Sequence, residues 1–311
     1  MRIAFRTDSS STIGAGHFMR CFSLAEELQH QGHECFFVSG ELLQPHIEKL
    51  ANASIQHFTV SPSDNDTGLE TAAILANQSA QALVVDHYQM GRPWEETAGK
   101  NMDSVLIIDD LCREHRPGSI ILDPTLNRSS TAYENSKPVR ALCGSDYALL
   151  AEQYYGLREA RLLTSRRPKR SLLICFGGGQ AAALTQRTIY SLSKDEIPRF
   201  DEVHVVLPGE GEAVAAVKTK CQELGFHFHP WVDDMSALLA NTSHAIGAPG
   251  GMSWERCALG IPAILVQIAD NQTDNIKALE KEGAIKACEI GQLEARLPEL
   301  MTILDKDYDQ M

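Results

Sequence analysis

Glycine, histidine and carboxylate residues gather near the amino terminus with a spacing that suits general-base chemistry. The segment Arg6–His17 reads RTDSSSTIGAGH and follows a short apolar run. Gly14 and Gly16 permit a tight turn and close approach of a ligand. His17 then opens a helix, whose positive end disfavours the imidazolium form and leaves a ring that can accept a proton. We predict His17 as a catalytic base oriented by Asp8; the alternative is a surface histidine in a glycine turn.

A second glycine-rich segment has the composition of a phosphate-binding turn. It reads IGAPGGMSWE over Ile246–Glu255, between an apolar run and a helical pattern. Backbone N–H groups at such a turn can face the two phosphates of a ligand. The candidate phosphate ligands are Gly250, Gly251, Met252 and Ser253. Glu255 could accept hydrogen bonds from ribose hydroxyl groups, and an acid that only caps the helix is the alternative.

A glycine triplet, Gly177–Gly179, follows the apolar run Leu172–Phe176. Gly177 and Gly178 are candidate phosphate or sugar contacts, although tight turns between strands and helices use glycine in any case. No Gly-Lys-Ser/Thr sequence follows, which excludes a Walker loop. The first glycine segment has Met19 where a dinucleotide fingerprint requires a third glycine, so NAD is excluded as well.

Three polar residues, Asp86, His87 and Tyr88, follow an apolar run that should be a buried strand. Ligands of open α/β sheets bind outside the carboxyl ends of the strands, so this cluster is a candidate substrate pocket. The alternative is that Asp86 only caps the next turn.

The whole chain of 311 residues alternates short apolar runs with helical periodicity. This alternation occurs twice over, which predicts the α/β class with two doubly wound, Rossmann-like domains. A basic stretch around Pro168 should join them, and we place the domains at residues 1–155 and 156–311. The expected strands are Ile3–Phe5, Cys35–Val38, Ile55–Val60, Leu83–Asp86, Val105–Asp109, Ile120–Asp123, Leu172–Phe176, Val203–Leu207, Phe226–Phe228, His244–Ile246 and Ala263–Val266.

The composition excludes several classes of function. The 28 basic and 41 acidic residues give a net charge of −13, which argues against a nucleic-acid partner. Arg6 and Asp8 interrupt any secretory signal, and no apolar run is long enough for a membrane span. We therefore expect a cytoplasmic protein with no membrane partner. The eight cysteines include no C-x-x-C pair, and we expect neither a metal nor a cofactor.

Six segments together resemble the UDP-sugar hydrolase family of pseudaminic acid biosynthesis, which supplies sugars for flagellin glycosylation. They occur in the family's order between Arg2 and about Lys281, and they read RTDSSSTIGAGHFMRC, VVDHY, IDDL, CGSDYALL, CFGGG and GMSWERCALGIPAILVQIADNQ. The first and the last are the most specific.

The resemblance implies a fold like that of the B-type glycosyltransferases (GT-B), with two domains facing a cleft. The first domain would carry the base, His17, and the second would bind UDP. The implied reaction is inverting attack of water on the anomeric carbon of UDP-2,4-diacetamido-2,4,6-trideoxy-β-L-altropyranose, releasing UDP and 2,4-diacetamido-2,4,6-trideoxy-L-altropyranose. Gly177, Gly178 and Glu255 would contact UDP, and Asn271 and Gln272 match residues near the sugar.

Three alternatives remain open: a glycosyltransferase with a UDP-sugar donor, a UDP-sugar 2-epimerase, and a non-catalytic sugar-nucleotide binding module. In each case the expected partner is a small-molecule UDP-sugar, and we expect a monomer. The tail Leu297–Met311 either forms a helix that crosses back to the first domain or frays.

Overall fold

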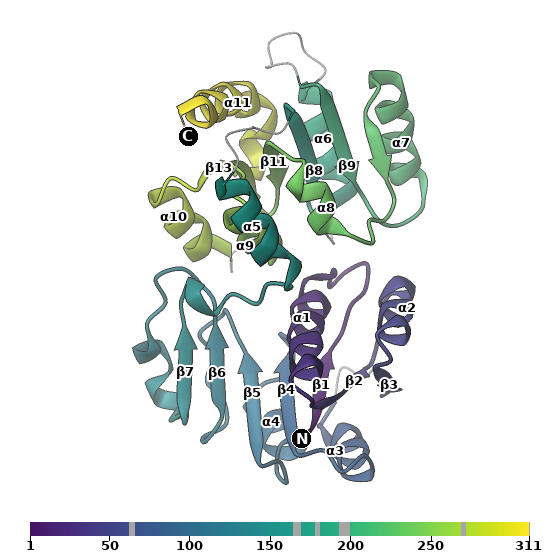
Figure 1. Ribbon diagram of the computed structural model, residues 1–311, viewed down its shortest axis with the longest axis vertical. Helices are drawn as coiled ribbons and strands as arrows, with labels where there is room; N and C mark the ends of the chain where they lie inside the picture. Colours follow the sequence, from purple (N-terminus) through teal and green to yellow (C-terminus); the bar gives the residue numbers. More distant parts are fainter. Residues whose placement is uncertain (62–65, 164–168, 178–180, 193–199, 269–271, 311) are drawn as a thin grey trace. The chain divides into compact units, whose positions relative to one another are not determined.

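The computed structural model describes residues 1–61, 66–163, 169–177, 181–192, 200–268 and 272–310. The chain divides into two compact units, Met1–Ala151 and Glu152–Met311, and each contains one wholly parallel sheet (Figure 1). Two α/β units of this kind confirm the predicted fold class. None of the described helices combines the length and the apolar character needed to cross a membrane.

The strand order of the first sheet reverses near the centre of the sheet. Its seven strands in spatial order are β3 (Gln56–Thr59), β2 (Glu34–Ser39), β1 (Arg2–Thr7), β4 (Ala82–Asp86), β5 (Ser104–Ile108), β6 (Ile120–Asp123) and β7 (Arg140–Cys143). Thr7 at the end of β1 pairs with Asp86 at the end of β4. The chain leaves these neighbours toward opposite sides of the sheet, which marks the position where ligands bind in such folds.

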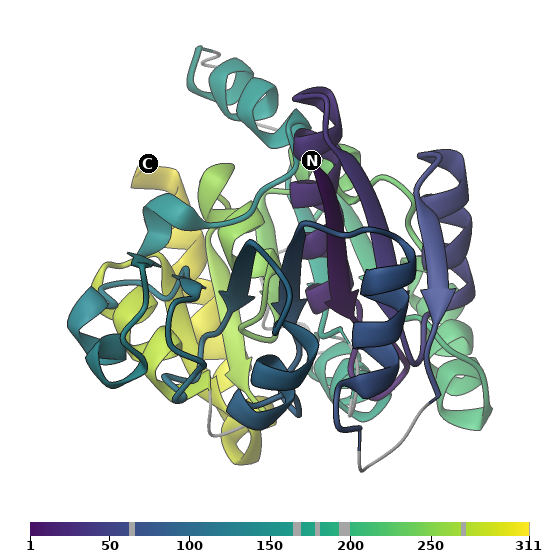
Figure 2. The same ribbon diagram turned by 90° about the horizontal axis from the view of Figure 1, so that it is seen from below.

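Helices cover both faces of this sheet (Figures 1 and 2). Ile3 and Phe5 of β1 pack toward the first pair of helices, while Ala4 packs toward the second pair. Burial on both faces explains why the central strands read as continuous apolar runs. The first pair is α1 (Gly16–His30) and α2 (Gln44–Asn52), and the second is α3 (Leu69–Asn77) and α4 (Arg92–Ala98).

The second sheet repeats this plan with six strands. Their spatial order is β10 (His227–His229), β9 (Glu202–Val206), β8 (Ser171–Cys175), β11 (His244–Gly247), β12 (Ala263–Gln267) and β13 (Ile285–Glu289). The order reverses between β8 and β11, whose last residues, Cys175 and Gly247, are paired. The helices of this unit are α5 (Gln153–Leu163), α6 (Ala181–Leu192), α7 (Glu212–Leu224), α8 (Met235–Ala240), α9 (Met252–Ala258), α10 (Thr273–Lys281) and α11 (Leu293–Gln310).

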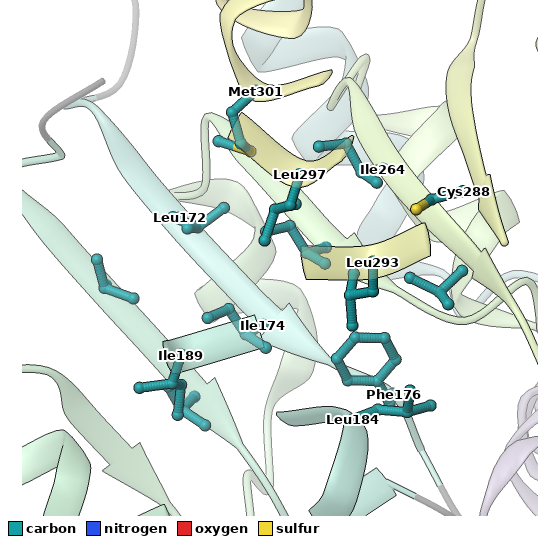
Figure 3. Packing of buried hydrophobic residues seen from close by; sticks show 14 of the residues in the cluster. Leu172, Ile174, Phe176, Leu184, Ile189, Ile264, Cys288, Leu293, Leu297 and Met301 are labelled. Carbon is teal, nitrogen blue, oxygen red and sulfur yellow. The ribbon is translucent and has the colours of Figure 1, made fainter. Parts of the chain in front are cut away.

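The carboxyl-terminal tail is a helix packed on its own unit. Leu297 and Met301 of α11 are fully buried, and they lie against Leu172 of β8 and Ile264 of β12 (Figure 3). The expectation that the tail frays is therefore wrong for Leu297–Leu304, because apolar side chains spaced by three and four residues cover the sheet.

Shortening a buried side chain of α11 should destabilise the second unit. We expect Leu297→Ala to lower the free energy of unfolding by about 2–5 kcal/mol, through lost burial and the cavity left behind. The matched control is Glu299→Ala on the exposed side of the same helix, which should change it by about 0.5 kcal/mol or less. Urea denaturation measures both values, and equal effects of the two substitutions would contradict this packing.

Candidate active site

A compact loop delivers the chain from β1 to the start of α1. The N–H of Gly14 donates to the carbonyl of Ser10 at 2.8 Å, and the N–H groups of Thr12 and Ile13 donate to the Ser10 hydroxyl. Gly14 has a φ of +84°, a conformation that favours glycine. An added Cβ at Gly16 would meet no atom within 4 Å, so packing does not explain that glycine. The loop places His17 in the first turn of α1.

His17 is held by the carboxylate at the end of β4. Its Nδ1 lies 2.6 Å from Oδ1 of Asp86, and both side chains are buried. Burial by itself would raise the pKa of Asp86, but the charge of Arg20 and the hydrogen bonds from Arg20 and His17 hold it far below the ordinary value. Because an ionised carboxylate only accepts, Nδ1 of His17 must carry the proton. Nε2 of a neutral ring is then the acceptor, as in a general base oriented by an acid.

Arg20 ties this pair to a second carboxylate. Its Nε and Nη2 donate to the two oxygens of Asp86 at 2.5 and 2.6 Å, which is a bidentate ion pair. Its Nη1 lies 3.4 Å from Oδ2 of Asp110, which also accepts from the Tyr88 hydroxyl at 3.2 Å. The Tyr88 ring stands edge-on to the ring of His17, with centroids 4.5 Å apart. The imidazole is thus fixed from two sides.

Asp8 does not orient His17, so the predicted pairing is wrong. Its carboxylate accepts from Arg6 at 2.5 Å, from the N–H of Gly40 at 2.8 Å and from Nε2 of His87 at 3.1 Å. Burial would raise the pKa of Asp8, but the hydrogen bond from His87 and the charge of Arg6 outweigh it and lower that pKa strongly. Successive residues of a strand point to opposite faces, so Asp86 meets α1 while His87 meets Asp8. Asp8 therefore ties three strand-end loops together.

A buried ionic network supports the neighbouring strand ends. Asp109, after β5, pairs with Arg113 at 2.9 Å and lies 3.3 Å from Nε2 of His115, whose Nδ1 lies 2.7 Å from Glu95 of α4. Burial would lower the pKa of His115, but the hydrogen bonds to Asp109 and Glu95 raise it to about 9. Arg113 also donates to the carbonyl of Tyr88 at 2.7 Å. The network thereby fixes the backbone that presents Tyr88.

In the second unit, the turn after β11 exposes backbone donors. The N–H groups of Gly250, Gly251 and Met252 make no hydrogen bond within the described part of the chain. An added Cβ at Gly250 or Gly251 would meet no atom within 4 Å. The N–H of Ser253 is instead bonded to the carbonyl of Gly250 at 2.9 Å, so Ser253 cannot offer it to a ligand. Three of the four predicted positions therefore retain a backbone donor, and their role in phosphate binding remains a prediction.

Glu255 lies in α9, the helix that follows this turn, and it is next to Tyr154 of α5. Burial raises the pKa of its carboxyl to about 6, even though the charge of Arg256 and a hydrogen bond with Tyr154 oppose that rise. The pKa of Tyr154 is raised too, by burial and by the Glu255 carboxylate. A carboxylate in this setting accepts hydrogen bonds with both oxygens at neutral pH, and protonation in a mildly acidic medium turns one of these oxygens into a donor.

The remaining predicted residues are only partly described. Gly177 follows β8 with a φ of +80°, which favours glycine. Gly178 and Asn271 lie outside the described residues. The Oε1 atom of Gln272 accepts from the N–H of Ile268 at 3.0 Å, so this side chain links the start of α10 to the residue after β12. Contacts of these four residues with a substrate remain predictions.

Sequence reasoning missed Arg20 and Arg256, and it identified Asp110 only as a polar residue at a strand end. Arg20 had a local signal, because a residue three positions after His17 lies on the same side of a helix. Asp110 follows a predicted strand in the same way as Asp86 does. Arg256 had no signal, since an arginine next to Glu255 in a helix is normally exposed.

Comparisons with curated proteins agree with the motifs. A UDP-2,4-diacetamido-2,4,6-trideoxy-β-L-altropyranose hydrolase from Campylobacter jejuni is 28% identical over 204 residues, which cover 63% of this chain and 68% of that protein. An uncharacterized protein from Methanocaldococcus jannaschii is 26% identical over 294 residues, which cover 86% and 55%. An N-acetylglucosamine transferase acting on N-acetylmuramyl-(pentapeptide) pyrophosphoryl-undecaprenol, from Exiguobacterium, is 32% identical over 147 residues, which cover 45% and 37%.

The aligned segments thus span about two thirds of the hydrolase and about half or less of the other two proteins. No family model matches the chain. The predicted resemblance to the UDP-sugar hydrolase is confirmed at this level of identity.

Solved structures show the fold. MurG from Acinetobacter baumannii has a TM-score of 0.62 at 17% identity, covering 97% of this chain and 90% of its own. LpCGTa in complex with UDP has a TM-score of 0.64 at 16% identity, covering 99% and 93%. A UDP-GlcNAc 2-epimerase from Neisseria meningitidis has a TM-score of 0.58 at 10% identity, covering 99% and 94%. The chain therefore has the GT-B fold, as predicted, and similarity at these identities shows the fold alone.

The pairing of His17 with Asp86 predicts its tautomer. Neutral His17 should carry its proton on Nδ1, and Asp86→Asn should shift it toward the Nε2–H form, because an amide can donate to Nδ1. Long-range ¹H–¹⁵N correlation spectra of the imidazoles distinguish the two forms. Asp8→Asn is the matched control and should change the signals of His87 but leave the tautomer of His17 as it is. An Nε2–H form of His17 in the unsubstituted protein would refute this arrangement.

Proposed function

We propose that the protein hydrolyses UDP-2,4-diacetamido-2,4,6-trideoxy-β-L-altropyranose to UDP and the free 2,4-diacetamido sugar, as a step of pseudaminic acid biosynthesis. The observation that carries this proposal is the contact of 2.6 Å between Nδ1 of His17 and Oδ1 of Asp86, which leaves Nε2 available as the proton acceptor. The similarity to the Campylobacter hydrolase supports the choice of substrate. In this proposal the first unit supplies the base and the second unit binds UDP.

The chemical step needs one proton acceptor and one stabilised leaving group. Nε2 of His17 takes a proton from water, and the water oxygen forms a bond to the anomeric carbon. The bond from that carbon to the β-phosphate oxygen breaks on the opposite side, and its electron pair leaves with UDP, so the configuration is inverted. Asp86 holds the imidazole and stabilises the imidazolium that forms. General-base assistance of this kind contributes about 10²–10⁴-fold.

The leaving diphosphate would be bound by the turn after β11. The N–H groups of Gly250, Gly251 and Met252 are donors fixed by the backbone, which stabilise developing negative charge without rearranging. Glu255 would accept hydrogen bonds from the ribose hydroxyl groups. Tyr88, with its ring against His17, would help to place the sugar. None of these steps calls for a metal ion, which the first experiment tests directly.

A second candidate is a glycosyltransferase, because a transferase is among the relatives and MurG shares the fold. A UDP-sugar 2-epimerase is a third, because a Neisseria epimerase has the same fold. The three reactions give different products from the same donor. A hydrolase needs no acceptor, a transferase requires one, and an epimerase inverts C2.

Hydrolysis should depend on His17 and not on a divalent metal. We expect the protein to release UDP and the free sugar from the altropyranose donor in EDTA without an acceptor, with inversion visible in early proton spectra. His17→Ala and Asp86→Asn should each reduce the rate by about 10²-fold or more, because the base or its orientation is lost.

Phosphorus and proton NMR follow both products. The matched control is His33→Ala, which removes a partly exposed histidine just before the amino end of β2 and should leave the rate unchanged. Undiminished release by His17→Ala would remove His17 as the base. If the unsubstituted protein releases no UDP, the hydrolase assignment fails for this sugar.

Nucleoside binding should weaken in mild acid because of Glu255. Its pKa of about 6 means that the carboxylate is present above pH 7 and becomes protonated as the pH falls through 6. We expect the affinity for uridine to fall by about tenfold between pH 7.5 and pH 5. Glu255→Gln should bind uridine weakly at every pH in this range. Uridine is titrated by NMR in place of UDP, because a terminal phosphate itself titrates near pH 6. A flat pH profile for the unsubstituted protein would contradict the role of Glu255.

A further inference from the structure

Arg256 of α9 is buried and forms no ion pair within the described part of the chain. Its side chain is 2% exposed and is among the largest fully buried side chains. Its Nη2 donates to the carbonyl of Ala248 at 3.1 Å and to the hydroxyl of Ser253 at 3.2 Å. Among the residues that the structure describes, no carboxylate lies within ion-pair distance of the guanidinium, and Nε has no hydrogen-bond partner.

This arrangement is unusual for the molecule and costly in physical terms. Arg6, the other buried arginine of the described residues, is paired with Asp8. A buried charge that lacks a counter-ion loses its hydration without compensation. Burial accordingly lowers the pKa of Arg256. Its neighbour Glu255 is a poor counter-ion, because burial raises the pKa of that carboxyl to about 6 in spite of the adjacent arginine.

The guanidinium lies where the strand order of the second sheet reverses. A Cβ added to Gly247, the last residue of β11, would be 3.1 Å from Nη1 of Arg256 and 2.2 Å from the carbonyl oxygen of Cys175 in β8. Gly247 must be a glycine because a Cβ would collide with the carbonyl of Cys175, and the guanidinium lies beside the same two strand ends. In open α/β sheets, this is the position outside which ligands bind.

The same guanidinium contacts both ends of the turn after β11 that contains Gly250, Gly251 and Met252. Ala248 precedes the turn and Ser253 follows it, and Nη2 bonds to both. Between them lie the backbone N–H groups of Gly250, Gly251 and Met252, which make no hydrogen bond within the described residues. A fixed positive charge on the protein side of these donors makes the potential on their open side more favourable for an anion.

We propose that Arg256 is a positioning residue for the diphosphate of the nucleotide, holding the turn in shape and providing the buried positive charge that the bound diphosphate compensates. This inference rests on the proposed function, because it takes UDP as the ligand of the turn. It adds to that function a residue that touches no substrate and acts through the turn.

The test compares the affinities for UDP and for uridine, measured by calorimetry and NMR at pH 7.5. Arg256→Met keeps an unbranched apolar stem and removes the guanidinium with its charge. We expect it to weaken UDP binding by about tenfold or more and to leave uridine binding unchanged. Arg256→Lys keeps the charge, so its ratio of UDP to uridine affinity should stay within about threefold of the unsubstituted protein. Circular dichroism checks that each variant folds.

The matched control is Arg158→Met, which removes an exposed arginine of the same unit and should alter neither affinity. An unchanged UDP affinity in Arg256→Met, or an equal loss of UDP and uridine affinity, would overturn the inference. If Arg256→Met fails to fold, the test uses Arg256→Lys alone. The inference is then overturned if the folded lysine variant has a ratio of UDP to uridine affinity more than threefold below that of the unsubstituted protein. Failure of the unsubstituted protein to bind UDP is a different result, because it sinks the proposed function itself.

Discussion

In a parallel sheet, the strand order reverses where two neighbouring strands send their following helices to opposite faces. Neither helix then covers the carboxyl ends of these two strands, and a crevice stays open there. Each unit of this protein has one such position, between β1 and β4 in the first sheet and between β8 and β11 in the second. The candidate site residues His17, Asp86, Gly250 and Gly251 lie at or just after the carboxyl ends of the strands at these positions. The strand order thus decides which side chains meet, and the loops and helix starts refine their geometry.

The two units use charge in different ways at these positions. In the first, the buried carboxylate of Asp86 is ion-paired with Arg20 and lies within hydrogen-bond distance of His17, so the imidazole is held by an ion-paired cluster. In the second, the buried guanidinium of Arg256 has only a carbonyl and a hydroxyl as partners within the described residues. A compensated cluster suits a group that must accept and return a proton. An uncompensated cation suits a site whose ligand brings the negative charge. Such a local positive charge can attract an anion even though the net charge of the chain is −13.

The fold itself is shared by a glycosyltransferase and by an epimerase, and it does not distinguish among their reactions. The glycines illustrate how fold and function can be separated. Gly14 and Gly247 are explained by backbone conformation or by close packing, whereas Gly16, Gly250 and Gly251 have open space where a side chain would be. The open space beside the second group leaves room for the close approach of a ligand that the proposed function requires.

The sequence by itself determined the elements whose signals are local: the central strands as apolar runs, the start of α1 at His17, and the glycine turn before α9. It did not reveal β7 and β13, because edge strands are short and half-exposed and lack continuous apolar runs. It named Asp8 as the partner of His17, since the two are near neighbours in the chain. Only the tertiary structure identified Asp86 as the partner of His17, because the two residues are 69 positions apart in the chain. The physical reason is that β1 and β4 pair in register and that the alternation of side chains points Asp86 toward α1, whereas Asp8 turns to Arg6 and His87.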